Sequence, residues 1–315
     1  MTDAGRDDVV TLYEDEARML PRIQSGYPPQ HLLLMLLGDY GISVGEPIPS
    51  GALVTLLDDF GVSVASARAA LSRLARRDLL QATRDGRNTA YALTERCARV
   101  VAEGRRLTYG YTGRIDDWDG RWTVVAYSIA EERRSQRAVL RARLRWLGFA
   151  PLQDGLWVSP RPPSAALDTA LAESGAGACT VFVGEHLGGA GRQQPMDAWD
   201  LDEIRGAFAD FVDEFEPIVP RAARGQVDPA EAMVARCRLT YRWFALANHG
   251  ANLPAGLLPA DWPGHRARVV FVTLIDALGP LAAQRFAVHV GALSSPLAAH
   301  VRALTIAEAL DSASP

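Results

Sequence analysis

The chain has 315 residues, of which 48% are hydrophobic and 22% charged, and its formal net charge is −4. At roughly 150 residues per domain this length predicts two or three domains, and the composition is that of a globular protein. The negative net charge excludes a uniformly basic nucleic-acid coat. No apolar run reaches the roughly 18 residues of a membrane span, so we expect none.

The cysteines Cys97, Cys179 and Cys237 lie far apart and are odd in number, which argues against a disulfide framework and a zinc cluster. The acidic N-terminus lacks the apolar segment of a signal peptide, so we expect a cytoplasmic protein with no membrane partner. The chain contains no lysine, and all 33 basic residues are arginine. This bias resembles the effect of GC-rich coding. The presence of an arginine therefore carries little information about function, and its position carries more.

The arginines are concentrated in one part of the chain. Residues 61–115 hold 11 arginines and 4 acidic residues, and residues 121–150 hold 7 arginines and 2 acidic residues. Residues 1–60 and 197–216 are strongly acidic instead. An acidic protein with one basic block is typical of a nucleic-acid-binding module on an acidic body, and an ordinary solvated charge run is the alternative. Charge alone does not separate the two.

The first elements are predicted to be helical. We expect a loose arm over residues 1–27, then a buried helix over residues 31–41, HLLLMLLGDYG, which is apolar nearly all round and ends at Gly41. The sequence ISVGEPIP then predicts a loop. Ser50 is expected to cap a helix through GALVTLLDDF that Gly61 ends.

The stretch GVSVASARAALSRLARRDLL, residues 61–80, predicts a third helix capped by Ser63. Its apolar residues recur at spacings of three and four and share one face, namely Ala67, Ala70, Leu71 and Leu74. The other faces hold serine and arginine. Residues 79–94 alternate apolar and polar residues around Asp85-Gly86, which predicts a β-hairpin with Arg84 and Arg87 beside its tip.

The order helix, helix, short turn, helix and hairpin predicts a winged helix-turn-helix over residues 28–112. In this architecture the helix after the short turn enters the major groove of double-stranded DNA, and the hairpin reaches the backbone. The alternative is the same fold used only for protein contacts. The predicted DNA-binding residues are Ser63, Ser66, Arg68, Ser72, Arg73, Arg76, Arg84 and Arg87.

After a helix over residues 94–110 and a linker, YTGRIDDWDG, a second unit is predicted over residues 118–190. The strand TVVAYSI is followed by a helix whose inward-facing residues are Val139, Leu140, Leu144 and Leu147. Two short strands around Asp154-Gly155, a second helix and a last strand come after it. The order βαββαβ is the ferredoxin-like pattern. Residues 195–315 then predict a helical domain, with a last helix over about 296–310, so the fold class is α+β.

No catalytic residues are identified. The histidines, among them His186, His249 and His265, are scattered, no metal-ligand spacing occurs, and GEHLGGAGR lacks the nucleotide-binding glycine spacings, so we expect no metal, no cofactor and no enzyme. Two stretches, TYRWF and DWPGHRAR, mix aromatic residues with arginine. They suggest an effector site, because a guanidinium pairs with phosphate, and ordinary helix packing is the alternative. The candidate residues are Arg242, Trp243, Trp262, His265 and Arg266.

Two motifs in this chain resemble the PaaX regulators of phenylacetic acid degradation. They are the turn GVS followed by RAALSRL, residues 61–74, and LLPADWPG, residues 257–264, with the ferredoxin-like unit between them. The resemblance covers nearly the whole chain. It implies a homodimeric repressor that binds palindromic operators and is released by a small effector, the best-known in the family being phenylacetyl-coenzyme A.

The middle unit also resembles the small ferredoxin-like nuclease of CRISPR adaptation, in which an aspartate at the end of the first strand binds metal. Here Ser128 occupies that place, and serine is a poor ligand for Mg²⁺. This departure disfavours the first alternative function, a metal-dependent nuclease. A second alternative is a co-regulator that acts through protein contacts only.

Overall fold

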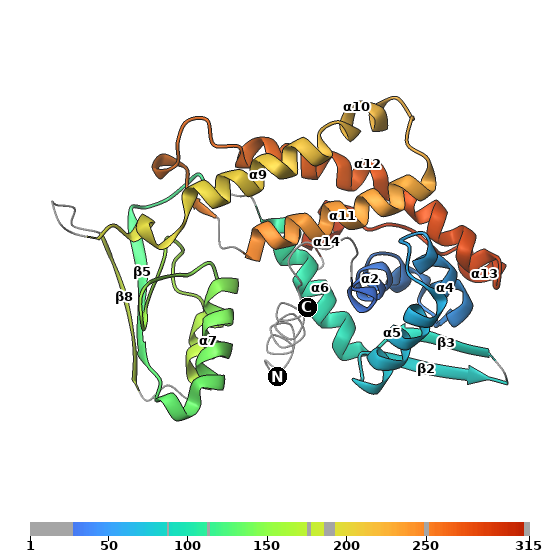
Figure 1. Cartoon of the computed structure of the whole chain (residues 1–315), viewed down its shortest axis with the longest axis horizontal. Helices are drawn as coiled ribbons and strands as arrows, with labels where there is room; N and C mark the ends of the chain where they lie inside the picture. The colour runs from blue at the N-terminus through green and yellow to red at the C-terminus, as the bar shows by residue number, and fades with distance from the viewer. Residues whose placement is uncertain are drawn as a thin grey trace.

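The chain is an α+β protein, as the sequence predicts. Two smaller units, one around a three-stranded sheet and one around a four-stranded sheet, lie on the same side of a layer of long C-terminal helices (Figure 1). The predicted arm over residues 1–27 and Arg87 lie outside the described residues. The computed structural model describes residues 28–86, 88–111, 114–174, 178–185, 193–248 and 252–311.

The first helix is longer than predicted. α2 (Pro29–Leu36) continues through a π-helical turn, η1 (Leu37–Gly41), into α3 (Ile42–Val44). The predicted end at Gly41 is therefore wrong. Gly41 keeps right-handed helical angles with φ −68°, whereas Gly45 adopts the left-handed conformation with φ 74° and ends the helix.

The second helix, α4 (Ser50–Asp58), begins without the predicted cap. Ser50 is its first helical residue and Pro49 holds the capping position with no side-chain hydrogen bond. The reason lies in a short strand that was predicted as loop, β1 (Ile48–Pro49), which pairs with the hairpin and draws Pro49 into extended backbone. The helix ends at Asp58, two residues before the predicted Phe60, and Gly61, with φ 72°, lies in the turn that follows.

The third helix and the hairpin are confirmed. α5 (Val64–Arg76) is followed by β2 (Leu80–Asp85) and β3 (Asn88–Leu93), and the sheet order is β1-β3-β2. The next helix, α6 (Glu95–Gly110), runs from this unit toward the middle of the molecule (Figure 1). The predicted linker then contains a strand, β4 (Arg114–Ile115). It pairs in parallel with β9 (Leu253–Pro254), so the linker is hydrogen-bonded to the C-terminal part of the chain.

The middle unit has an antiparallel sheet in the order β6-β7-β5-β8. Its strands are β5 (Arg121–Ser128), β6 (Ala150–Gln153), β7 (Leu156–Ser159) and β8 (Ala178–Glu185), and its helices are η2 (Glu131–Arg133), α7 (Arg134–Trp146) and α8 (Ala165–Glu173). On one face Val125 and Trp157 pack against the helices, where Leu140 and Leu144 are buried. Val139 and Leu147, also predicted to face inward, are only partly buried.

The C-terminal part is helical, as predicted. Its elements are η3 (Pro195–Ala198), α9 (Leu201–Phe215), α10 (Ile218–Ala223), α11 (Pro229–Asn248), η4 (Ala255–Leu257), α12 (Gly264–Gly291), α13 (Ser295–Ala298) and α14 (Ile306–Asp311). The single last helix predicted over 296–310 is wrong. An extended segment interrupts it because Arg302 and Leu304 bind distant groups, Ser43 and Arg236, through their backbone.

The longest helix, α12, has the length and apolar composition of a membrane span. It is the only helix in the described ranges with both properties. Half of its most apolar window, 50%, is buried inside the protein. Phe271, Leu274 and Leu278 are fully buried against the other C-terminal helices. These contacts are those of a core helix.

One hydrophobic core crosses the predicted domain boundaries. Leu53, Leu71 and Leu74 of the N-terminal unit belong to the same buried cluster as Met233 of α11 and Phe286 of α12. A second cluster joins Trp122 and Val158 of the middle sheet to the C-terminal helices. The boundaries at 28–112, 118–190 and 195–315 stay predictions, but the units pack together through shared apolar surface.

An ionic cluster fixes α4 on α12. Asp59, at the end of α4, accepts two hydrogen bonds from Arg285, from Nε at 2.7 Å and Nη2 at 2.6 Å. His289 Nε2 lies 2.9 Å from Asp59 Oδ2. Burial acts to raise the pKa of Asp59, but the hydrogen bonds from Arg285 and His289 outweigh it, so this pKa lies below the usual value.

Replacing Gly155 by alanine should destabilise the middle unit. A Cβ there would lie 2.6 Å from the carbonyl oxygen of Tyr127, at φ 73°, so the left-handed cost and a backbone clash add to about 3 kcal/mol. The control Gly61→Ala has φ 72° and no atom within 4 Å of its Cβ, so about 1 kcal/mol is expected. Urea unfolding measures both, and equal losses would contradict the clash.

Replacing Asp59 by asparagine should weaken the protein at neutral pH by about 1–3 kcal/mol, because charge-assisted hydrogen bonds are lost. Since the folded pKa of Asp59 is depressed, its contribution is complete above the unfolded pKa and disappears as pH falls through the folded pKa. The wild-type and variant stability curves should therefore converge in acid. The exposed neighbour Asp58→Asn is the control, and a gap that stays constant down to acid pH would refute the assignment.

Candidate nucleic-acid interface

The helix α5 starts where its first turn is capped. The Ser63 hydroxyl oxygen accepts the Ser66 N–H at 3.3 Å, as the sequence predicts, and Ser63 Oγ also donates to Ser66 Oγ at 3.0 Å. The predicted apolar face is confirmed, since Ala67, Ala70 and Leu74 are fully buried and Leu71 is 2% exposed. This face seats α5 on α2 and α4.

The opposite face of α5 is exposed and cationic. Within the described part of the chain, Arg68, Arg73 and Arg76 form no ion pair. Many arginines elsewhere are paired, as Arg205 is with Asp261 at 2.6 Å and Arg221 with Glu231 at 2.6 Å. The exposed positions on this face are Ser66, Arg68, Ser72, Arg73 and Arg76. Their charges and hydroxyls are therefore available to an external anion.

The hairpin stands beside α5 and extends away from the rest of the molecule (Figure 1). Its strands pair without a break from Leu80 opposite Leu93 to Asp85 opposite Asn88, and Gly86 has φ 57°. Arg84 lies near the tip, is exposed, and makes no ion pair among the described residues. Arg87, predicted to flank the same tip, lies outside the described residues.

Thr94 fixes the hairpin relative to α5. Its hydroxyl donates to the carbonyl oxygen of Asp78, in the turn after α5, at 3.0 Å, and accepts the Cys97 N–H at 3.2 Å to cap α6. The Leu79 N–H also binds the Leu74 carbonyl at 3.0 Å. The base of the hairpin, the end of α5 and the start of α6 thus meet at one residue.

These contacts present α5 and the hairpin as one surface. The 13 residues of α5 span roughly 20 Å, and its cationic face runs along the whole helix. A helix of this size fits the major groove of B-form DNA, which is roughly 12 Å wide. Arginine and serine are residues that bind phosphate oxygens and base edges there.

The five predicted effector residues do not share one surface. Trp243 is fully buried, stacks on Phe271 with centroids 4.7 Å apart and donates to the Thr108 carbonyl at 3.0 Å. Trp262 is partly buried against Phe208. Arg242 pairs with Glu214 and Arg266 with Glu216, and His265 is exposed. In this state Trp243 has no surface to offer a ligand.

No cluster of histidine, cysteine and acidic residues with metal-binding geometry occurs among the residues that the structure describes. Ser128 is the last residue of β5 and is exposed. His186 and His249, which are not expected to be metal ligands, lie outside the described ranges. Cys97 and Cys237 are buried free thiols, and Cys179 is an exposed one.

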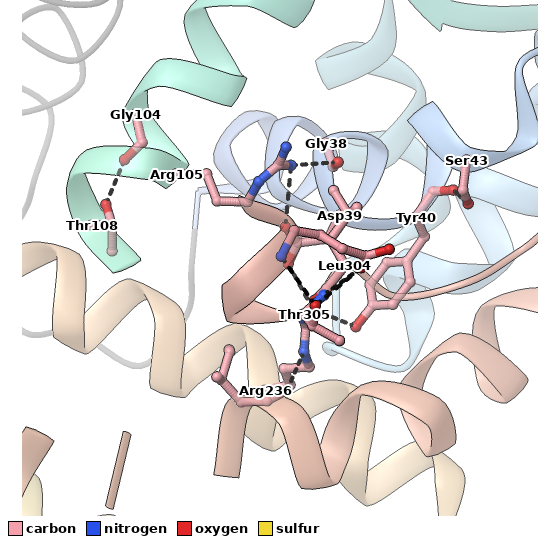
Figure 2. A network of polar contacts seen from close by, with 12 residues as sticks. Gly38, Asp39, Tyr40, Ser43, Gly104, Arg105, Thr108, Arg236, Leu304 and Thr305 are labelled. Atoms are coloured by element: carbon pink, nitrogen blue, oxygen red, sulfur yellow. Dashed lines mark hydrogen bonds and ion pairs between the residues drawn. The ribbon is translucent and has the colours of Figure 1, made fainter. Parts of the chain in front are cut away.

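A buried polar network that the sequence did not predict joins the N-terminal unit to α11 (Figure 2). Arg236 of α11 is fully buried and binds Asp39 Oδ2 at 2.8 Å, the Tyr40 hydroxyl at 2.9 Å and the Leu304 carbonyl at 3.0 Å. Arg105 of α6 donates to the Gly38 carbonyl at 2.8 Å. The one available signal was Asp39 inside an otherwise apolar helical run, a charge that needs a buried partner.

Three successive parts of the chain match models of the same protein family. Family models match as PaaX-like protein over residues 29–97, PaaX protein central Cas2-like domain over 116–196, and PaaX-like protein C-terminal domain over 199–288.

Two similar proteins cover most of the chain. The transcriptional repressor PaaX of Escherichia coli (strain K12) is 27% identical over 276 residues, 84% of this chain and 86% of that one. An uncharacterised protein of Mycobacterium tuberculosis matches in fold, with a TM-score of 0.50 and 24% identity over 79% of this chain and 96% of that one. With three successive family models matched in order, the chain belongs to the PaaX family.

Proposed function

We propose that this protein is a DNA-binding transcriptional regulator that acts as a repressor. The observation on which this rests is the exposed face of α5, where Arg68, Arg73 and Arg76 form no ion pair among the described residues of an otherwise acidic protein. The similar Escherichia coli protein is named a transcriptional repressor, which supports the same function and favours a regulator over an enzyme.

The N-terminal unit, residues 28–112, is assigned as a winged helix-turn-helix with α5 as the recognition helix. Ser66, Arg68, Ser72 and Arg73 approach base edges and phosphates in the major groove. Ser63 lies at the helix N-terminus, where backbone N–H groups favour a phosphate, and Arg76 binds backbone farther along. Arg84 and Arg87 serve as phosphate contacts of the wing.

The middle unit, residues 118–190, is assigned as ferredoxin-like because its strand order in the sheet, β6-β7-β5-β8, suits that fold. We assign a homodimer that binds a palindromic operator, with half-sites one helical turn or a multiple apart. The outer strand β8 supports a protein contact here, since Phe182 is 58% and Val183 49% exposed at a sheet edge that no other described strand pairs with.

A small effector of the acyl-coenzyme A type is proposed to release the protein from DNA. Arg242 and Arg266 would exchange Glu214 and Glu216 for ligand phosphates, near Trp262 and His265, and Trp243 would become accessible only in a rearranged state. Such a ligand shifts the DNA-bound population only if it binds the two states with different affinities.

Replacing Arg73 by alanine should weaken DNA binding by about 1–3 kcal/mol, because an unpaired guanidinium on the groove-facing side of α5 is lost. Replacing Arg84 should weaken binding to all sequences and lower the salt slope by about one, as the loss of one phosphate contact does. Fluorescence anisotropy over a salt series measures both effects.

The matched control is Arg205→Ala. It removes the same charge from α9, in the C-terminal part of the chain, where Arg205 pairs with Asp261. It should bind DNA as the wild type does. If Arg73→Ala and Arg84→Ala bind no worse than Arg205→Ala, the interface is elsewhere. If all three bind less tightly by the same factor, only net charge matters and a specific groove contact is refuted.

A further inference from the structure

A cavity lies where α2, α6 and α11 meet, between the N-terminal unit and the C-terminal helices. Its volume is about 50 Å³ and it is partly open to solvent. Most of its wall is apolar or aromatic, and Asp39 and Arg105 form its charged end. The residues that matter for its chemistry are His31, Asp39, Val101, Arg105, Tyr241 and Phe244.

The charges around this cavity do not balance. The side chains of Arg236, Arg105 and Asp39 are 1%, 7% and 10% exposed, so two guanidinium groups share one carboxylate. Arg236 Nη1 binds Asp39 Oδ2 at 2.8 Å, whereas Arg105 Nη1 is 3.8 Å from Asp39 Oδ1. A buried charge is costly unless it is paired, and among the described residues one positive charge here lacks a close counterion.

The neighbouring acidic groups do not supply that counterion. Burial raises the pKa of the Tyr40 hydroxyl and the Cys237 thiol well above their usual values, more than Arg236 beside them lowers it. Burial likewise raises the pKa of Tyr109 to about 12. All three groups are therefore neutral at physiological pH. Of the carboxylates in the described ranges, Asp39 alone is buried.

Arg105 also has an unused donor. Its Nη1 donates to the Gly38 carbonyl at 2.8 Å, but its buried Nε has no hydrogen-bond partner in the part of the chain that the structure describes. The residue as a whole is 8% exposed and lines the cavity. A buried donor without an acceptor costs free energy, and native structures contain few of them. An acceptor that carries a negative charge would satisfy the donor and the charge together.

We propose that this cavity binds a small monocarboxylate with an apolar body, its carboxylate on Arg105 and its body against Tyr241 and Phe244. At roughly 10–15 Å³ for each water-sized group, the cavity holds the carboxylate and the first carbons, and the rest of the ligand lies in the open mouth. The edge-to-face pair of His31 and Tyr241, with centroids 5.2 Å apart, forms part of the aromatic wall.

The site lies where it can act on the N-terminal unit, which we propose to bind DNA. Asp39 and the Gly38 carbonyl belong to the π-helical turn η1, and such turns are frequent at functional sites. A carboxylate that draws Arg105 away from Gly38 removes one of the contacts that hold η1 on α6. This coupling rests on the proposed DNA-binding function, whereas ligand binding itself does not.

Isothermal titration calorimetry with benzoate and benzamide, two ligands of nearly the same shape, tests the site. Wild type should bind benzoate at least tenfold more tightly than benzamide, because only benzoate carries a negative charge that pairs with the Arg105 guanidinium. Arg105→Met should weaken benzoate binding about tenfold. The control Arg106→Met, at the next position of α6 and paired with Glu103 at 2.7 Å, should bind as wild type does.

Met35→Trp is a second variant, in case Arg105→Met does not fold. It fills the cavity from the partly exposed wall of α2 and should abolish benzoate binding while leaving Arg105 in place. Equal affinity for benzoate and benzamide, no binding of benzoate at millimolar concentration, or unchanged binding by Met35→Trp would overturn the proposal. DNA affinity with and without benzoate is measured separately, so a protein that binds benzoate but no DNA refutes the proposed function and keeps the site.

Discussion

The Arg236 guanidinium is fully buried and donates to Asp39, to the Tyr40 hydroxyl and to the carbonyls of Ile275 and Leu304. These acceptors lie on three separate stretches of chain, because Asp39 and Tyr40 belong to η1, Ile275 to α12, and Leu304 to the extended segment after α13. Removing any one would leave a buried charge or donor unsatisfied, which is among the costliest local defects in a protein. The contact therefore fixes the π-helical turn of the first helix on the C-terminal helices. Because α5 packs on that first helix, its direction in space follows from the same contact.

Charge pairing, rather than charge content, distinguishes the exposed face of α5 from the rest of the protein surface. Arginine is the sole cationic residue type besides histidine in this chain, and the body pairs many of its arginines with neighbouring carboxylates. Those of the exposed α5 face have no such partner among the described residues. A surface of this kind attracts phosphate while the acidic remainder of the protein repels it, so association is oriented as well as attractive.

The sequence was sufficient where a local rule decides the structure. Ser63 caps its helix, and Gly86 and Gly155 turn their hairpins, because each acts within a few residues. Errors arose where distant partners decide. β1 and β4 are strands only through pairing with β3 and β9, and the segment after α13 is extended because Leu304 binds Arg236.

For the same reason the exposed face of α5 was predictable and the cavity at Arg105 was not. Helical periodicity places Arg68 and Arg73 on one surface from the sequence alone. The cavity is assembled from three helices whose residues are separated by up to about two hundred positions, and no periodicity relates Asp39 to Arg236. The predicted effector residues illustrate the limit, since TYRWF is one stretch of sequence but places Trp243 in the core and Arg242 at the surface.

The most direct measurement compares the affinity of the wild-type protein for DNA from its own upstream region and for a shuffled duplex of the same composition, by fluorescence anisotropy across a salt series. If α5 reads a specific operator, the upstream DNA is bound at least about a thousandfold more tightly, and both affinities fall steeply with salt. Equal affinity for the two duplexes, or binding that does not respond to salt, would contradict it.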